Sequence, residues 1–425
     1  METAALIALL IFIPTYILIS VRNLRVVVLD RFAIALLGAA AMVLLGVLSA
    51  EQTMQAIDLN TLALLLGMML IVIGLEICGF FDLLAREVVK RAGDQLRLLV
   101  LIMVVTAVLS ALILNDTVVL LFTPVVIKCC QVSSANPVPF LVAEAVSANI
   151  GSVATPVGNP QNAYIAVQSG LTFNEFFIHL FPVAVISLLI AIGMIWVVFR
   201  KNLAGDDGKG RRIDCAMAMN GLGAGKMDRS IYLVLGVLVL VFVGFISAQY
   251  WGMPLSLIAL AGGIVVLFAL PLINRKANAK EMVLKVDWTL LLFFIGLFVL
   301  LKGVEVSGLL TEMINFFQSV GGGGMETIPG LSGFCAILSN LISNVPAVML
   351  LAPFVSHIGT SSLWLALAAS STLAGNATIL GAAANVIVVE KASAAGVEVS
   401  LWQFVKAGLP ITFLTLLASM LLLTL

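Results

Sequence analysis

The stretch from Ser110 to Val126, SALILNDTVVLLFTPVV, decides the fold of this chain. It is apolar on both flanks, but each flank is too short to cross a bilayer, because a helical span needs about 20 apolar residues. Asn115 and Asp116 stand between the flanks. The chain repeats the pattern 229 positions later as SNLISNVPAVMLLAPFV, Ser339 to Val355, with eight of 17 paired positions identical. We therefore predict that both copies are hairpin tips that face each other across a transport site.

The composition indicates an all-α polytopic membrane protein. The 425 residues are 62% hydrophobic and 10% charged, with a mean hydropathy of +1.18, which no soluble domain could bury. The first apolar segment has no basic region and no small-residue cleavage site, so we expect a retained span and not a signal peptide. The cysteines form no CxxC pair, and we expect all five to be unpaired packing residues: Cys78, Cys129, Cys130, Cys215 and Cys335.

The apolar segments predict about ten membrane crossings. Two interrupted segments, 97–130 and 328–358, are interpreted as re-entrant hairpins, and two others, 137–170 and 361–390, as single spans broken near the middle. The remaining spans are expected at 3–21, 30–50, 59–80, 176–199, 229–248, 252–273, 287–308 and 403–425. With this count, 21 of the 22 Lys and Arg residues fall on one face. The positive-inside rule then places both termini outside, in a multi-pass protein of the bacterial inner membrane.

A polar linker at 200–228 divides the chain into two halves, 1–199 and 229–425. Its NGLGAGK run lacks the first glycine of a phosphate-binding loop, and Met227 stands where that loop has Ser or Thr. We interpret the linker as a cytoplasmic connector. Since the chain carries no ATPase signature, any transport is expected to be driven by a gradient.

The two halves repeat more than the hairpins. The 229-residue offset also aligns 58–81 with 287–310 and pairs Asp58 with Asp287. After the hairpins the offset is 223, and the pattern T-x-x-G-x-x-x-N occurs at Thr155, Gly158 and Asn162 and again at Thr378, Gly381 and Asn385. Each predicted half has five crossings, an odd number, so the halves would be inverted repeats, the plan of many secondary transporters. A pseudo-symmetric scaffold would not explain why the polar breaks are repeated.

The breaks supply the candidate site. Broken backbone at membrane depth is tolerated where it is buried in protein or lines a cavity, and its freed amides and carbonyls can bind ions. The alternative for Asn162 and Asn385 is that they only cap the breaks. The residues predicted to bind substrate or ion are Asn115, Asp116, Thr117, Thr155, Gly158, Asn159, Asn162, Ser343, Asn344, Asn376, Thr378, Gly381 and Asn385.

Asp116 is an acidic residue that the second copy lacks, because Val345 occupies the equivalent position there. A membrane carboxylate is costly unless it is protonated, paired or hydrated, so Asp116 is a candidate carrier of H⁺ or Na⁺. We place a possible Na⁺ site near Asn115, Asp116 and Asn344, and expect no other cofactor. Glu144 is a second candidate, although it could lie near the cytoplasmic edge. For Lys302 and Glu305 we expect an internal ion pair.

Four motifs in order, NDTVVLLFTP, SANIGSVATPVGNPQN, SNVPAVMLLAP and TILGAAAN, resemble the ion transporter superfamily of citrate, arsenite and sodium–proton antiporter-like permeases. The resemblance covers nearly the whole chain and is greatest to bacterial anion permeases. It implies a mobile transport domain, a fixed scaffold and a possible homodimer. The dicarboxylate–sodium symporter branch carries Ser-Asn-Thr at both tips, whereas this chain has Leu114-Asn115-Asp116 and Ser343-Asn344-Val345. The Asn-Asp tip is more similar to the arsenite branch.

The sequence thus predicts a secondary active transporter that moves a small anion or oxyacid, citrate-like or arsenite-like, across the inner membrane with H⁺ or Na⁺. The alternative is a sodium–proton antiporter. An enzyme is disfavoured by the lack of a nucleophile–base or metal motif, and a channel would not need inverted broken repeats. Nothing in the chain indicates a nucleic-acid partner.

Overall fold

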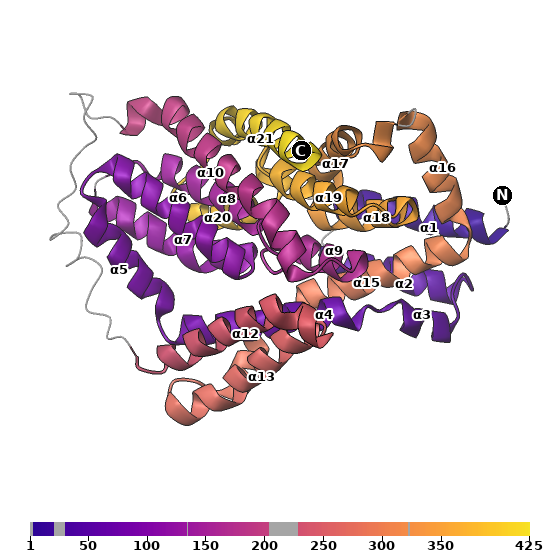
Figure 1. Cartoon of the computed structure of the whole chain (residues 1–425), viewed down its shortest axis with the longest axis horizontal. Coiled ribbons are helices and arrows are strands. Elements are labelled where there is room, and N and C mark those ends of the chain that lie inside the picture. The colour runs from indigo at the N-terminus through magenta and orange to yellow at the C-terminus, as the bar shows by residue number, and fades with distance from the viewer. Residues whose placement is uncertain (1–2, 21–29, 134, 204–227, 322–323) are drawn as a thin grey trace.

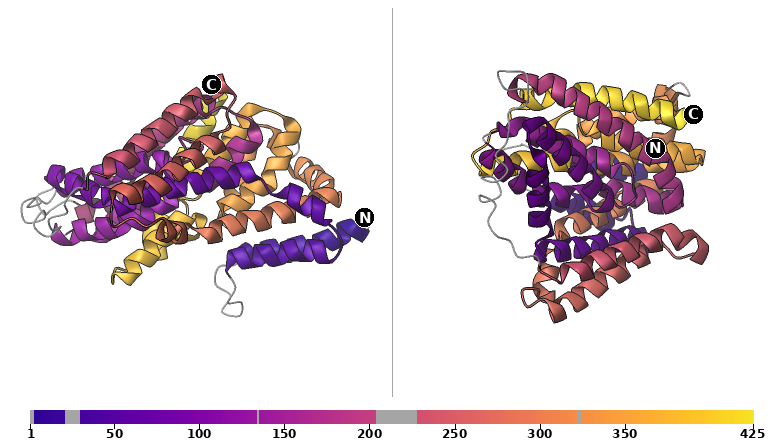
Figure 2. Two further views of the ribbon diagram at one scale, coloured as in Figure 1. Left: turned by 90° about the horizontal axis from the view of Figure 1, so that it is seen from below. Right: turned by 60° about the vertical axis from the view of Figure 1, so that its left-hand side comes forward.

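The protein is a bundle of helices, shown as a computed structural model in Figures 1 and 2. The structure describes residues 3–20, 30–133, 135–203, 228–321 and 324–425. Nine helices in these ranges are long and apolar enough to cross a membrane. No strand occurs in the described ranges, as expected for a chain whose backbone groups must be satisfied within the bilayer. The predicted all-α membrane fold is confirmed.

The two halves contain the same order of helices. The first half has α1 Thr3–Ser20, α2 Arg31–Leu44, α3 Ala50–Ala56, α4 Leu59–Ile77, α5 Phe80–Ala92, α6 Gln95–Leu112, α7 Asn115–Val132, α8 Pro137–Ser152, α9 Pro160–Ser169 and α10 Phe173–Leu203. The second has α12 Ile231–Trp251, α13 Leu255–Ile273, α14 Ala279–Lys285, α15 Trp288–Val306, α16 Leu309–Gly321, α17 Ile328–Ile342, α18 Asn344–Ile358, α19 Ser361–Ala374, α20 Ala383–Ala394 and α21 Leu401–Thr424, with short 3₁₀ turns at Gly324–Glu326 and Ile379–Gly381.

The helices pack in two groups. In one, α4 packs on α13 and α15 packs on α2; in the other, α6 and α7 pack on α8, α17 packs on α19, and α10 packs on α21. Figure 1 shows α4, α12 and α13 below α6, α7, α8 and α10. The paired glycines of the repeat lie at two of the closest crossings. A Cβ on Gly67 would lie 2.3 Å from the backbone of Ala259, and one on Gly296 would lie 2.8 Å from the backbone of Ala35. Small residues let membrane helices approach this closely.

Several expectations need correction. The predicted span 30–50 is a shorter helix, because α2 ends at Leu44 and the turn after it leads to α3. The residues that follow the predicted spans 59–80 and 287–308 contain the helices α5 and α16, each with one apolar face, which the predicted spans did not include. The two helices are offset by 229 residues, so they belong to the repeat. The linker residues 204–227, with the NGLGAGK run and Cys215, and the loop arginines Arg22 and Arg25 lie outside the described residues.

Two expectations about side chains are confirmed. The four described cysteines, Cys78, Cys129, Cys130 and Cys335, are free and buried. Lys302 Nζ lies 3.0 Å from Glu305 Oε1, so the predicted ion pair forms, with the Glu305 carboxylate on the exposed side.

Basic residues gather at one end of the molecule, which we call the basic end. Lys90 and Arg91 close α5, Arg200 and Lys201 close α10, and Lys285 closes α14. Figure 1 shows α5 at this end, and α3 and α16 at the opposite end. The short helix α3 carries Glu51 and α16 carries Glu312 in their first turns, and neither has a basic residue in its last turn. This asymmetry is the structural counterpart of the charge pattern in the sequence.

Candidate functional site at the hairpin tips and helix breaks

The first tip joins α6 to α7 at Ile113 and Leu114, and Asn115 begins α7. The Asn115 amide nitrogen of the backbone donates to the carbonyl oxygen of Gly158 at 2.8 Å. The Thr155 hydroxyl donates to the carbonyl oxygen of Ala111 at 2.6 Å. A backbone bond and a side-chain bond therefore attach the first tip to the break between α8 and α9.

The second tip is a single residue, Ser343, between α17 and α18. Its φ of 75° and ψ of 159° are sterically unfavourable for a residue with a side chain, and it is the only described non-glycine residue with a positive φ. With the side-chain amide of Asn344 oriented by its hydrogen-bond partners, its Nδ2 donates to the carbonyl oxygens of Ser371 and Gly381, each at 3.0 Å. The second tip is thus attached to the break between α19 and α20, as the first tip is attached to its own break.

Equivalent asparagines close the two breaks. Asn162 Nδ2 donates to the carbonyl oxygens of Ser152 and Thr155 at 3.0 and 3.2 Å. Asn385 Nδ2 donates to the carbonyl oxygens of Gly375 and Thr378 at 2.7 and 2.9 Å. These four carbonyls lie at or beyond the end of a helix, so the bonds satisfy groups that would otherwise be buried in the membrane without a partner. The capping role considered for both asparagines is the role these bonds perform.

Glycine is required where each break folds back on itself. A Cβ on Gly158 would lie 2.4 Å from the carbonyl oxygen of Ser152, and one on Gly381 would lie 2.6 Å from that of Gly375. Both distances are far below a normal contact, so a side chain at either position would push the break apart.

The two tips and the ends of both breaks line one cavity of about 460 Å³, which we call the tip cavity. Among the predicted site residues, Asn115, Asp116, Ser343 and Asn344 line it. The breaks contribute mainly residues that we did not single out. The remaining lining residues are Asp30, Arg31, Phe32, Pro160, Gln161, Asp287, Thr289, Leu290, Phe293, Val345, Pro346, Ala382, Ala383 and Ile387.

The other predicted residues lie behind the cavity wall. Thr117, Thr155, Gly158, Asn159, Asn162, Asn376, Thr378, Gly381 and Asn385 do not line it. Several of them bond to other parts of the site. Asn159 Nδ2 donates to the hydroxyl of Ser152 at 2.9 Å and to that of Thr372 at 3.2 Å, and Thr378 Oγ1 lies 3.5 Å from Asn340 Oδ1. These contacts join the breaks to α8, α19 and α17.

A buried junction, missed in the sequence, links the two halves through Asn149 of α8. Asn149 Nδ2 donates to Asn376 Oδ1 and to Asn385 Oδ1, both at 2.9 Å, and its Oδ1 accepts from Asn115 Nδ2 at 3.2 Å. All four side chains are buried. Asn149 therefore connects the first tip to the second break. Its only sequence signal was its place inside the SANIGS motif.

A second link between the halves ends on Thr372, which occupies the position equivalent to Asn149 at the 223-residue offset. The Thr372 hydroxyl accepts from Asn159 Nδ2 and from Gln161 Nε2, both at 3.2 Å. Gln161 also lines the tip cavity, so this bond orients a side chain of the wall.

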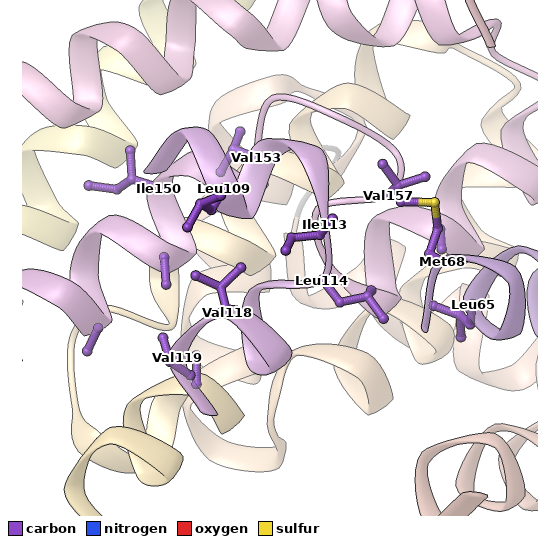
Figure 3. Packing of buried hydrophobic residues seen from close by; sticks show 14 of the residues in the cluster. Leu65, Met68, Leu109, Ile113, Leu114, Val118, Val119, Ile150, Val153 and Val157 are labelled. Atoms are coloured by element: carbon purple, nitrogen blue, oxygen red, sulfur yellow. The ribbon is translucent and has the colours of Figure 1, made fainter. Parts of the chain in front are cut away.

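Apolar contacts surround the first tip (Figure 3). Figure 3 shows Leu114 beside Leu65 and Val157 beside Met68, so α4 supports both the tip and the break. Val118 lies on the other side of the tip. These side chains are buried, and they separate the polar tip from the rest of the bundle.

Glu144 lies outside the tip cavity, fully buried in α8. Its Oε1 accepts from the Thr123 hydroxyl at 3.1 Å, and its Oε2 has no hydrogen-bond partner. No described group of three or more His, Cys, Asp or Glu residues could hold a metal ion. A Na⁺ site at the tips would therefore depend on amide, hydroxyl and backbone oxygens with Asp116.

A fold of apolar helices with polar tips and breaks around one cavity is that of a multi-pass membrane transporter. The family profile described as "Citrate transporter" matches residues 7–368, and the chain belongs to this family. It is 34% identical to the "46 kDa membrane protein" of Mycobacterium leprae, over 97% of this chain and 96% of that protein. It is 31% identical to the "Silicon efflux transporter LSI3" of Oryza sativa subsp. japonica, over 90% of each. The recognised resemblance to the superfamily is confirmed.

The crystal structure of the YdaH transporter of Alcanivorax borkumensis has a similar fold. The TM-score is 0.56 at 16% sequence identity, and the alignment covers 99% of this chain and 98% of that one. A likeness at this level of identity supports the fold alone.

Proposed function

We propose that the protein is a secondary active transporter that moves a small oxyacid or anion through the tip cavity, coupled to H⁺ or Na⁺. The observation that carries the proposal is the convergence of both tips and both breaks on one cavity of about 460 Å³, whose size suits a small ligand. With the basic end in the cytoplasm, the chain would lie in the inner membrane with both termini outside.

The charges of the cavity wall favour a neutral oxyacid over a free polycarboxylate. Among the lining residues, three are acidic, Asp30, Asp116 and Asp287, and one is basic, Arg31. This excess of negative charge would repel a multiply charged anion unless protons or a cation accompanied it. An undissociated oxyacid such as arsenite or silicic acid meets no such repulsion, and the rice relative is named for silicon efflux. The side-chain amide groups of Asn115, Asn344 and Gln161 would supply hydrogen bonds to its hydroxyls.

The proposal is tested first by binding. A thermal-shift screen of the purified protein would cover arsenite, silicic acid, citrate, dicarboxylates, sulfate and phosphate, each with and without sodium. A ligand that binds the folded state raises the unfolding temperature, and the stabilisation grows with the logarithm of the ligand concentration above Kd. We expect a shift with an oxyacid; stabilisation by a polycarboxylate alone, without sodium or protons, would contradict the charge argument.

Coupling is tested by Asp116→Asn in proteoliposomes. We expect uptake driven by an imposed ion gradient to fall at least tenfold, with Asp82→Asn as a matched control on the exposed face of α5. Unchanged gradient-driven uptake in Asp116→Asn would remove Asp116 from the mechanism. Adding sodium alone to acid-loaded vesicles distinguishes this transporter from the alternative, a sodium–proton antiporter. The antiporter would make the vesicle interior alkaline rapidly without any oxyacid.

A further inference from the structure

The equivalent residues Asp58 and Asp287 cap equivalent helices but have different neighbours. Asp58 accepts from the backbone of Asn60 and Thr61 at the start of α4, and Asp287 accepts from Leu290 at the start of α15. Asp58 Oδ2 also accepts a hydrogen bond from Gln168 Nε2 of α9 at 3.1 Å. Asp287 lines the tip cavity, whereas Asp58 and Gln168 line a second cavity, also of about 460 Å³.

The difference extends to the helices themselves. In the first half, α4 packs against α9. In the second half, the equivalent helices α15 and α20 make no contact of similar extent over their described residues, because the tip cavity lies between them. Leu290 and Phe293 of α15 form one side of the cavity, and Ala383 and Ile387 of α20 form another.

The residue equivalent to Gln168 is Lys391. The 223-residue offset that pairs Asn162 with Asn385 also pairs Gln168 with Lys391. Lys391 is exposed in the last turn of α20, and Asp287 directly follows the basic helix α14 and is also exposed. Asp287 thus lines the tip cavity on α15, and Lys391 lies one helical turn beyond Ile387, a cavity-lining residue of α20, where the first half has an acid–amide bond.

We propose that Asp287 and Lys391 form an ion pair when the tip cavity closes, as the counterpart of the Asp58–Gln168 bond. The inference rests on the proposed transport function, since alternating access in repeat-built transporters moves one set of helices against the other around the site. Closure would give α15 and α20 the contact that α4 and α9 have here. The Asp58–Gln168 bond would then be the one that separates.

An exposed ion pair suits this role because it is weak. Exposed pairs contribute about 0.2–1 kcal/mol, which changes an equilibrium about one-and-a-half- to fivefold. The closed state would be favoured without being trapped. The Coulomb attraction would also decrease with salt.

The pair is tested by a double-mutant cycle on cavity access. The test protein has its native cysteines replaced and carries one reporter cysteine in the tip cavity, introduced by Phe32→Cys. Asp287→Asn keeps the helix cap, since Asn caps as well as Asp, and Lys391→Gln removes the base. A neutral maleimide is used so that local charge does not alter its concentration.

We expect each single variant to label about two- to fivefold faster than the parent, and the double variant to label no faster than either single. Lys280→Gln, an exposed lysine of α14, is the matched control and should leave the rate unchanged. Unchanged rates in both single variants, or effects that multiply in the double variant, would overturn the pair.

A cross-link gives an independent readout. Asp58→Cys with Gln168→Cys should form a disulfide readily, and Asp287→Cys with Lys391→Cys should form one and protect the reporter in the tip cavity. A disulfide in the first pair but none in the second would also reject the proposal. Neither measurement needs substrate. If the labelling rates show no coupling between the two variants while uptake proceeds, the ion pair alone is refuted. If the labelling rates are coupled but no uptake occurs, the proposed function alone is refuted.

Discussion

Replacing Asn149 should uncouple the first tip from the second break. Asn149→Ala removes three buried hydrogen bonds, to Asn376 and Asn385 at 2.9 Å and from Asn115 at 3.2 Å. Hydrogen bonds between membrane helices average about 0.6 kcal/mol, so the three contribute about 2 kcal/mol. Each partner left buried without a bond adds a cost of about 1–3 kcal/mol where it cannot find another. We expect a loss of about 2–4 kcal/mol in the free energy of unfolding.

The assay is reversible unfolding by SDS in mixed micelles, followed by the ligand thermal shift. The matched control is Asn274→Ala, which loses buried bonds to the Ser230 hydroxyl at 3.0 Å and from the Lys276 amide at 2.9 Å, at the end of α13. Both variants should be destabilised, but only Asn149→Ala should lose the ligand-induced shift, because Asn274 does not line the tip cavity. An Asn149→Ala protein within about 0.5 kcal/mol of the parent, the range of a neutral surface change, would refute the junction.

Three further changes probe the site. Ser343→Gly should raise the free energy of unfolding by up to about 2 kcal/mol. Relief of the strained φ of 75° contributes about 1–3 kcal/mol, and the greater conformational entropy of glycine in the unfolded chain offsets about 0.5–1 kcal/mol of it. A lower free energy of unfolding would show that the strain is absent. Gly158→Ala should abolish folding, seen as aggregation on size exclusion, since its Cβ would lie 2.4 Å from a carbonyl oxygen, whereas Gly193→Ala, with nothing within 4 Å, should be stabilised by about 1 kcal/mol. Glu144→Gln should leave the pH dependence of uptake in place, because Glu144 lies outside the tip cavity that Asp116 lines, and a pH-independent Glu144→Gln protein would transfer the coupling role to Glu144.

The sequence predicted the polar interruptions well, because each one is conspicuous in an apolar chain. Asn115, Ser343 and the two TxxGxxxN motifs lie at the ends of helices, where unwinding needs glycine and an amide to satisfy the carbonyls. The structure gives the repeated motif a physical meaning, since Asn162 and Asn385 bond equivalent carbonyls. Repetition at a fixed offset was the most informative signal.

The residues missed are those in which the halves differ. Asn149 has Thr372 at its equivalent position, so no repeated letter marks it, and it lies near the end of a helix where an asparagine reads as a simple cap. Gln161 has Ala384 as its counterpart. Side-chain contacts between segments more than 200 residues apart depend on packing that periodicity does not reveal. The helices α5 and α16 were missed for another reason. Each has 13 residues and only one apolar face, so neither stands out beside the longer, uniformly apolar spans.

The pairs that match and the pairs that differ have different physical tasks. Matched residues such as Gly67 and Gly296, or Asn162 and Asn385, close helix crossings and satisfy broken backbone, which both halves need equally. Some differing residues line the cavity or link the halves: Asp116 of the first tip and its counterpart Val345 of the second both line the tip cavity, and Asn149 and Thr372 form the two links between the halves. A site built from two identical halves would present a symmetric surface, which cannot orient an asymmetric ligand or place one carboxylate beside it. We therefore propose that the asymmetry at the tips determines the specificity for substrate and ion.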